Sequence, residues 1–202
     1  VQFVNGTAEG GVKTFGLQPG AAAATMNGDR LNFNTDNDGT DGSIEIFAGD
    51  GGVLTINSQL RDNNGNEPAQ GFTKVGNGTV ILTNATNSYG DGGTNTGSTT
   101  TISEGTLLLR GGGELANTTD LTVQSGAFFG GTIAAADLNP GTSIGTVTFD
   151  AGSGIAVDVD GSGTPLTDLS NLGAIDISGL NLAVEEVAGS TLGATQTIIL
   201  SG

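Results

Sequence analysis

The side chains best suited to chemistry in this sequence lie in an acidic turn, Thr-Asp-Asn-Asp-Gly-Thr-Asp-Gly at residues 35–42. Asp36, Asp38 and Asp41 could offer carboxylate oxygens to calcium, which takes about six to eight oxygen ligands. The spacing begins like an EF-hand loop, but the glycine comes early and no glutamate closes the loop at the right distance. Because Asp, Asn and Gly are also the commonest turn residues, we prefer a solvated turn and keep calcium as the alternative.

Other candidate chemistry is sparse. The chain has no histidine, so the usual neutral-pH proton acceptor is missing, and most acidic residues stand beside Gly or Asn in predicted turns. The pair Asp158 and Asp160 is a weaker calcium candidate. The run Thr94–Ile102 could order water as an ice-binding surface does, but a single run makes no array and β-propensity explains threonine. We therefore expect no enzyme and no cofactor beyond the possible calcium.

The composition restricts the partners. The 202 residues include 37 Gly, 21 acidic and only 5 basic residues, for a net charge of −16. The basic residues are scattered singly, so nucleic acid and anionic membranes are poor partners. There is no cysteine, and no apolar run approaches the ~18 residues that span a bilayer. The chain begins at Val1 without a signal-peptide pattern, which suggests a processed or excised segment.

The elements that would position these residues are short strands. Apolar residues alternate with polar or small ones, and Gly, Asn, Asp and Ser clusters separate the runs. No long amphipathic helix can be placed, so we predict an all-β chain. The expected strands are Leu31–Phe33, Ser43–Phe47, Val53–Asn57, Thr79–Thr83, Ser98–Ile102, Thr106–Arg110, Asp120–Val123, Gly145–Phe149, Gly154–Val159, Ala174–Ile177, Asn181–Val184 and Thr197–Leu200.

Two architectures compete for such a chain, an antiparallel sandwich or barrel and a parallel β-solenoid. The spacing favours the solenoid, with a coil of ~20–25 residues. Glycine would form the corners, and Asn or Thr ladders would join successive coils by hydrogen bonds. We expect one elongated domain over residues 1–202, with irregular coils over 1–70 and C-terminal coils over 151–202.

One stretch, 74–109, reads KVGNGTVILTNATNSYGDGGTNTGSTTTISEGTLLL. It resembles the autotransporter-associated β-strand repeat, although extra residues lengthen the corner near 91–98. A later stretch, Asn139–Thr146, is similar to the family's P-G-x-S-x-G-T element, so the match covers about residues 72–150. The matching residues in the first stretch are Lys74, Gly76, Gly78, Thr79, Leu82, Asn87, Tyr89, Gly92, Gly93, Ile102, Gly105, Thr106 and Leu107.

This resemblance implies a right-handed parallel β-helix, exported from a bacterium and used as a stalk, adhesin or surface fibre. It implies no shared catalytic residue. Residues 76–93 are accordingly expected to form one coil, with Tyr89 covering the core at a corner. We place the protein outside the cell or on the bacterial surface.

The two ends of the chain suggest how it assembles. Both read as strands, and a solenoid exposes strand edges and an apolar core at its ends. Three explanations fit these strand-like ends: excision from a longer stalk, a cap formed by a non-solenoid loop, and stacking onto a second copy. We expect head-to-tail stacking into a homopolymer; the alternative is an adhesin segment that binds glycan or a host surface, for which aromatic residues are scarce. The expected self-association residues are Val1, Phe3, Val4, Ile198, Ile199 and Leu200.

Overall fold

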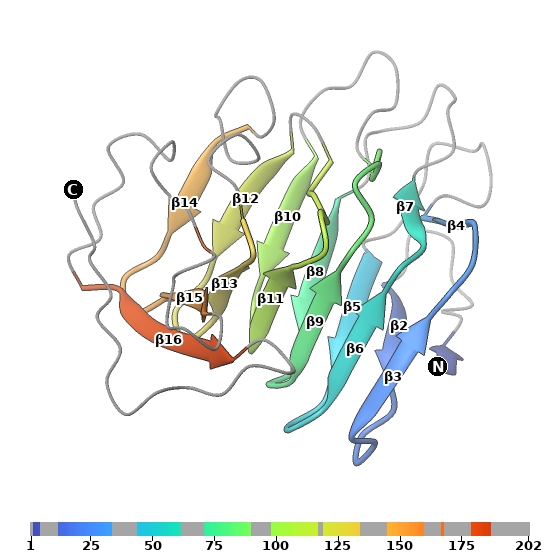
Figure 1. The fold of residues 1–202 in the computed structure, drawn as a ribbon, viewed down its shortest axis with the longest axis horizontal. Helices are drawn as coiled ribbons and strands as arrows, with labels where there is room; N and C mark the ends of the chain where they lie inside the picture. Colours follow the sequence, from blue (N-terminus) through green and yellow to red (C-terminus); the bar gives the residue numbers. More distant parts are fainter. Residues whose placement is uncertain are drawn as a thin grey trace.

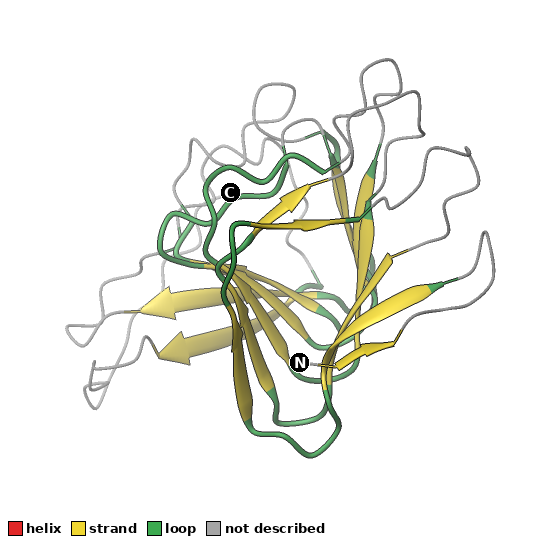
Figure 2. Ribbon diagram, turned by 90° about the vertical axis from the view of Figure 1, so that its right-hand side faces the viewer, coloured by secondary structure: helices red, strands yellow, loops and turns green. Residues whose placement is uncertain are grey.

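The protein is built from strands and turns. A computed structural model describes residues 2–4, 12–33, 44–61, 71–89, 98–116, 119–133, 145–159, 167 and 179–186, and no helix occurs among them. The strands stack along the long axis of the molecule, from β3 near one end to β16 near the other (Figure 1). In a view turned by 90° from that of Figure 1, the sheets form walls around the interior (Figure 2).

The strands belong to two main sheets and one short one. The first sheet has the order β1 (Gln2–Val4), β2 (Lys13–Leu17), β5 (Ile44–Ala48), β8 (Phe72–Val75), β10 (Thr99–Ile102), β12 (Asp120–Val123) and β14 (Val147–Phe149). The second has the order β3 (Ala23–Met26), β6 (Val53–Ile56), β9 (Thr79–Leu82), β11 (Thr106–Leu109), β13 (Phe128–Gly131), β15 (Gly154–Val159) and β16 (Asn181–Glu186). The third pairs β4 (Arg30–Asn32) with β7 (Gln59–Arg61).

Nearly all of these pairings are parallel. From β2 onward, each strand of the first sheet pairs in parallel with the equivalent strand one coil later, and the second sheet follows the same rule. The exception is β1, which pairs antiparallel with β2. A chain that adds one strand to each sheet per coil is a parallel β-helix, or β-solenoid, so the predicted fold class is confirmed.

The coils differ in length. Ile44 pairs with Phe72, 28 positions later, whereas Thr100 pairs with Leu121, only 21 positions later. The strands stay short, at three to six residues, so the connections absorb most of the difference. Insertions in connecting segments of a solenoid leave the sheets intact because backbone pairing stays within the strands.

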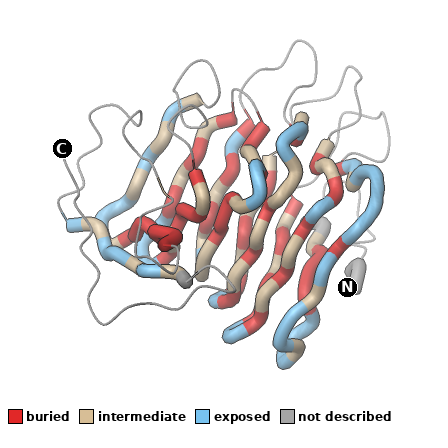
Figure 3. Tube along the Cα trace, viewed as in Figure 1, coloured by how far each residue is buried: buried red, intermediate tan, exposed pale blue. Residues whose placement is uncertain are grey.

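Two columns of inward-facing side chains run along the second sheet. We name them after early members: the Leu54 column consists of Ala24, Leu54, Val80, Leu107, Phe129, Ile155 and Leu182, and the Ile56 column of Met26, Ile56, Leu82, Leu109, Gly131, Val157 and Val184. Their middle members are among the most buried side chains of the core. In Figure 3 the burial runs through the middle of the solenoid and fades at β3 and β16. Alternation along each strand thus builds two apolar clusters, a large one from Phe15 to Ile133 and a small one formed by Ile155, Val157 and Val159.

Glycine turns the chain between the first and second sheets. Gly105 has a φ of +63°, a left-handed conformation that side chains rarely adopt. A Cβ on Gly105 would lie 2.4 Å from the carbonyl oxygen of Gly78 in the preceding coil. Both constraints require glycine, as the sequence predicted for a corner.

Polar ladders join the coils, also as predicted. The Asn57 side-chain amide donates to Oδ1 of Asn27 at 2.7 Å, and the Thr83 hydroxyl donates to Oδ1 of Asn57 at 2.6 Å. Asn87 spans three coils: its Oδ1 accepts from the Leu60 N–H at 2.8 Å, and its Nδ2 donates to the Glu114 carbonyl at 2.7 Å. The two Asn87 bonds satisfy backbone groups of other coils, the Leu60 N–H of β7 and the Glu114 carbonyl.

Tyr89 lies in the core at the corner that the sequence assigned to it. Its ring is fully buried, with its centroid 5.2 Å from that of Phe72 and 5.6 Å from that of Phe33. Its hydroxyl lies 2.9 Å from Oγ1 of Thr100, and burial raises the pKa of the phenol. The ring therefore closes the corner with apolar surface and a satisfied hydroxyl.

Candidate functional site

The end of the second sheet at β16 presents an apolar edge. Leu182 and Val184 continue the two inner columns, yet their side chains are 45% and 44% exposed. Their register partners one coil earlier, Ile155 and Val157, are each only 3% exposed. Core positions thus lose their cover at the last described coil. Burying such side chains contributes about 1.5–3 kcal/mol each when complete, so this edge is a candidate site for association.

The backbone of β16 directs part of its hydrogen-bonding groups toward that edge. The Asn181 N–H donates to the Ser153 carbonyl at 2.8 Å, which sets the alternation of the parallel ladder. Asn181, Ala183 and Glu185 therefore direct their backbone groups toward β15, and Leu182 and Val184 direct theirs outward. Among the described strands, β16 pairs with β15 alone.

The opposite end of the solenoid differs between the two sheets. In the second sheet β3 pairs with β6 alone among the described strands, so no described strand lies along its outer edge. In the first sheet the antiparallel β1 covers the edge of β2. Val12, directly before β2, is 50% exposed. The large apolar side chains that are exposed in the described part of the chain are therefore Val12, Leu182 and Val184, at the two ends.

The residues predicted to self-associate are only partly placed. Phe3 and Val4 lie on β1, where they pair in register with Phe15 and Thr14, so this segment covers the edge of β2. Val1, Ile198, Ile199 and Leu200 lie outside the described residues. Sequence reasoning did not single out Leu182 and Val184, because an alternating strand does not reveal whether another coil follows it.

The predicted calcium ligands Asp36, Asp38 and Asp41 also lie outside the described residues. Within the described ranges, no group of three or more His, Cys, Asp or Glu side chains could hold a metal ion. Asp158, the weaker calcium candidate, has a different role because its carboxylate is taken up by an arginine.

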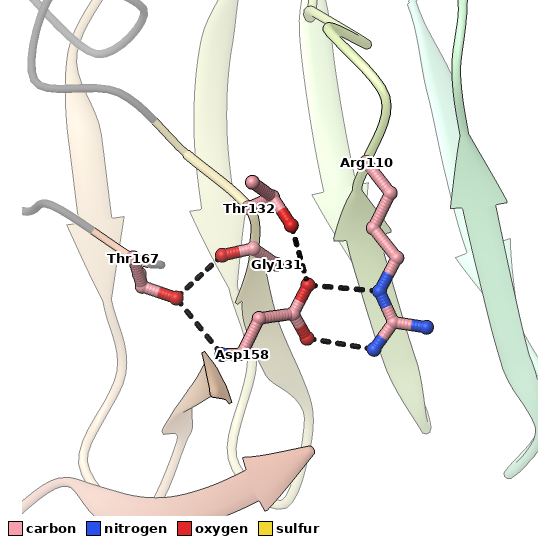
Figure 4. Close-up of polar contacts among 5 residues, drawn as sticks. All are labelled: Arg110, Gly131, Thr132, Asp158 and Thr167. Atoms are coloured by element: carbon pink, nitrogen blue, oxygen red, sulfur yellow. Dashed lines mark hydrogen bonds and ion pairs between the residues drawn. The ribbon is translucent and has the colours of Figure 1, made fainter. Parts of the chain in front are cut away.

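This carboxylate is the centre of a polar cluster near the β16 end (Figure 4). The guanidinium of Arg110 donates from Nε to Oδ2 of Asp158 at 2.8 Å and from Nη2 to Oδ1 at 2.6 Å. The Thr132 hydroxyl donates to Oδ2 at 2.9 Å. The Thr167 hydroxyl accepts from the Asp158 N–H at 2.9 Å and donates to the Gly131 carbonyl. The cluster joins the ends of β11, β13 and β15 and fixes Thr167 onto them.

The electrostatics of the cluster favour the ion pair. The side chain of Asp158 is completely buried, and that of Arg110 is 21% exposed. The bidentate hydrogen bond to Asp158 raises the pKa of Arg110 above its ordinary value, and the nearby charge of Glu185 acts in the same direction. A guanidinium and a hydroxyl bind the Asp158 carboxylate, so this side chain joins three coils in the described part of the chain.

A buried lysine replaces an apolar residue in the core of the first sheet. Lys74 stands in register between Ile46 and Ile102, and its side chain is buried. Its ammonium donates to the carbonyls of Gly76, Val75 and Glu104, the last at 2.9 Å. Burial lowers the pKa of Lys74 to about 8, although the Glu104 charge partly offsets this effect. The amine thus satisfies corner carbonyls that strand pairing leaves free.

Two further findings complete the description. The described residues include no helix long and apolar enough to cross a membrane. Comparison with protein-family models, with curated proteins and with solved structures gives no match.

Proposed function

We propose that this chain is a non-enzymatic structural subunit, which stacks head-to-tail into a fibre outside the cell or on its surface. The observation that carries the proposal is the distribution of exposed apolar side chains. Val12 lies in the first described coil, and Leu182 and Val184 lie in the last. A contact between unlike ends is heterologous and propagates as a filament unless it closes into a ring.

The contacts of the buried polar side chains support a structural role. The buried ionisable groups Lys74 and Asp158 bind backbone carbonyls and a guanidinium, and the buried Tyr89 hydroxyl binds a threonine. The resemblance of residues 72–150 to the autotransporter-associated repeat supports an extracellular location and a stalk-like or fibrous role. The alternative is an adhesin segment that binds glycan. The core positions of Phe33, Phe72 and Tyr89 give it no support, because those rings offer no exposed platform.

Charge sets the conditions for assembly. Each copy carries a net charge of −16, so neighbouring copies repel one another at low ionic strength. Salt shortens the screening length from about 10 Å at 0.1 M to about 3 Å at 1 M, while apolar contacts persist. We therefore expect polymerisation to increase with sodium chloride concentration.

Sedimentation velocity over a range of protein and salt concentrations tests this proposal. The expected result is a monomer at low concentration and a growing series of larger species at high concentration, with more polymer in high salt. A chain that stays monomeric at the highest protein concentration, at both low and high sodium chloride, would contradict the proposed function.

A further inference from the structure

The two end strands of the second sheet, β3 and β16, match each other in register, and each has one edge along which no described strand pairs. Every strand of this sheet is parallel, and each inner column has one member per coil. The strand that would follow β16 must therefore be parallel and must place apolar residues over Leu182 and Val184. In β3, Ala24 and Met26 occupy those two column positions.

From this match we infer that β16 of one copy pairs in parallel with β3 of the next copy, with Leu182 facing Ala24 and Val184 facing Met26. The inference rests on the proposed head-to-tail function and assigns its interface. It replaces the chain termini, predicted from sequence, with two strands inside the chain.

The backbone groups of the two edges are complementary as well. The Val53 N–H donates to the Ala22 carbonyl, and the Asn57 N–H donates to the Met26 carbonyl. Because backbone groups alternate in direction along a parallel strand, those of Ala23 and Thr25 point away from β6, toward the outer edge of β3. On β16 the outward groups belong to Leu182 and Val184. In the inferred register the Leu182 N–H donates to the Ala23 carbonyl, and the Thr25 N–H donates to the Leu182 carbonyl. The junction then repeats the hydrogen-bond pattern that joins the coils within one chain.

Side-chain chemistry at the junction is favourable. The facing segments, Asn181–Val184 and Ala23–Met26, contain no charged residue, although the chain as a whole is strongly acidic. The small Ala24 leaves room for the branched Leu182, and Met26 is a flexible side chain that fills irregular gaps. These uncharged segments avoid the repulsion that would oppose contact elsewhere between copies, and the charged residues of β16, Glu185 and Glu186, lie beyond them.

The first sheet cannot continue in the same way. Its edge strand β1 is antiparallel to β2, so a parallel strand from another copy cannot pair with β2 there. This asymmetry assigns the parallel junction to the second sheet. It also explains why β1 residues are poor candidates for a continuation of the solenoid.

A paired-cysteine experiment tests the register. The chain contains no cysteine, so the double variant Thr25→Cys and Ala183→Cys introduces the only two thiols. Both positions belong to the same outward column of the second sheet. Six strand steps separate them within one chain, about 29 Å, so they cannot bridge intramolecularly. Across the inferred junction they stand about 4.8 Å apart between Cα atoms, within disulfide range.

The expected result under mild oxidation is a ladder of covalent dimers, trimers and longer species on a non-reducing gel. The control is the double variant Thr25→Cys and Thr148→Cys, because Thr148 is exposed on β14 in the other sheet. It should give no ladder beyond the level of random collision. Equal ladders from the two variants would overturn the inferred register.

A second variant keeps the inference testable without cross-links. Leu182→Asp places a charge at the apolar edge and, since Leu182 is already half exposed, should leave the circular dichroism of the monomer unchanged. We expect the concentration needed for polymerisation to rise at least about tenfold. Suppose that the wild-type chain and Leu182→Asp polymerise equally and that the Thr25→Cys/Ala183→Cys variant gives no ladder. In that case the inferred interface is wrong, while the proposed fibre function stands. If the wild-type chain does not polymerise at all, the proposed function fails with it.

Discussion

Replacement of Arg110 by methionine gives the sharpest test of the polar cluster near the β16 end. Methionine keeps much of the side-chain length and removes the guanidinium. Asp158 would then remain fully buried, with the Thr132 hydroxyl as its side-chain donor in the cluster. Removal of one partner of a buried ion pair costs about 3–5 kcal/mol, because the other charge stays buried without compensation. We expect Arg110→Met to lower the free energy of unfolding by this amount.

The chain provides a matched control for that substitution. Nη2 of Arg30 lies 3.3 Å from Oδ2 of Asp29, but both side chains are exposed, that of Arg30 by 49% and that of Asp29 by 89%. Exposed pairs contribute about 0–1 kcal/mol, so Arg30→Met should have almost no effect. The double variant Arg110→Met with Asp158→Leu should recover much of the lost stability, because it removes the orphaned charge.

Urea unfolding followed by far-ultraviolet circular dichroism measures these differences. Solenoids can unfold coil by coil, so hydrogen exchange read by mass spectrometry should accompany it. For Arg110→Met, loss of protection should concentrate in β11, β13 and β15, the strands whose ends the cluster joins. The reasoning is refuted if Arg110→Met costs no more than Arg30→Met.

Three further predictions concern other parts of the chain. Because burial lowers the pKa of Lys74 from 10.5 to about 8, the unfolded chain binds more protons between these values, and stability should rise with pH from about 8 to 9.5, by at most about 2 kcal/mol before solvent screening. Urea midpoints should show that rise in the wild-type chain and its loss in Lys74→Met; equal slopes would contradict it. Asn87→Ala leaves the buried Leu60 N–H without its acceptor and should cost about 1–3 kcal/mol in the same assay, whereas an unchanged midpoint would show that the bond adds nothing. Chelation with EDTA should leave the thermal midpoint unchanged, since we interpret residues 35–42 as a solvated turn, and a fall of several degrees would instead establish bound calcium.

The fold class could be predicted because its signals are local. Alternating strands and Gly-rich turns recur along the chain, and the corner glycines and Asn ladders are where the sequence placed them. Sequence reasoning missed β2, β3, β7, β8 and β13, and several of these strands have weak or broken patterns. β3 is Ala-Ala-Thr-Met and β13 is Phe-Phe-Gly-Gly, while β8 carries Lys74 at a core position. In each case the sheet on either side, and not local propensity, determines the strand.

Contacts between coils could not be predicted, because they depend on register. Arg110 and Asp158 are 48 positions apart and meet across the intervening coil that carries Thr132. Similarly, Thr73, Thr101, Thr122 and Thr148 stand in one outward column of the first sheet, which the sequence did not reveal. The coils differ in length, so no fixed period connects these residues. A sequence pattern identifies the strands but not which residues become neighbours.

Fibre diffraction combined with electron microscopy of the purified chain tests the central claim most directly. A solenoid that stacks end to end keeps its strands perpendicular to the filament axis, so the account predicts unbranched filaments of uniform width. Their diffraction should show a reflection at about 4.7–4.8 Å along the fibre axis, from the spacing of parallel strands. Single short rods at every concentration, or filaments whose 4.7–4.8 Å reflection lies across the axis, would contradict head-to-tail stacking.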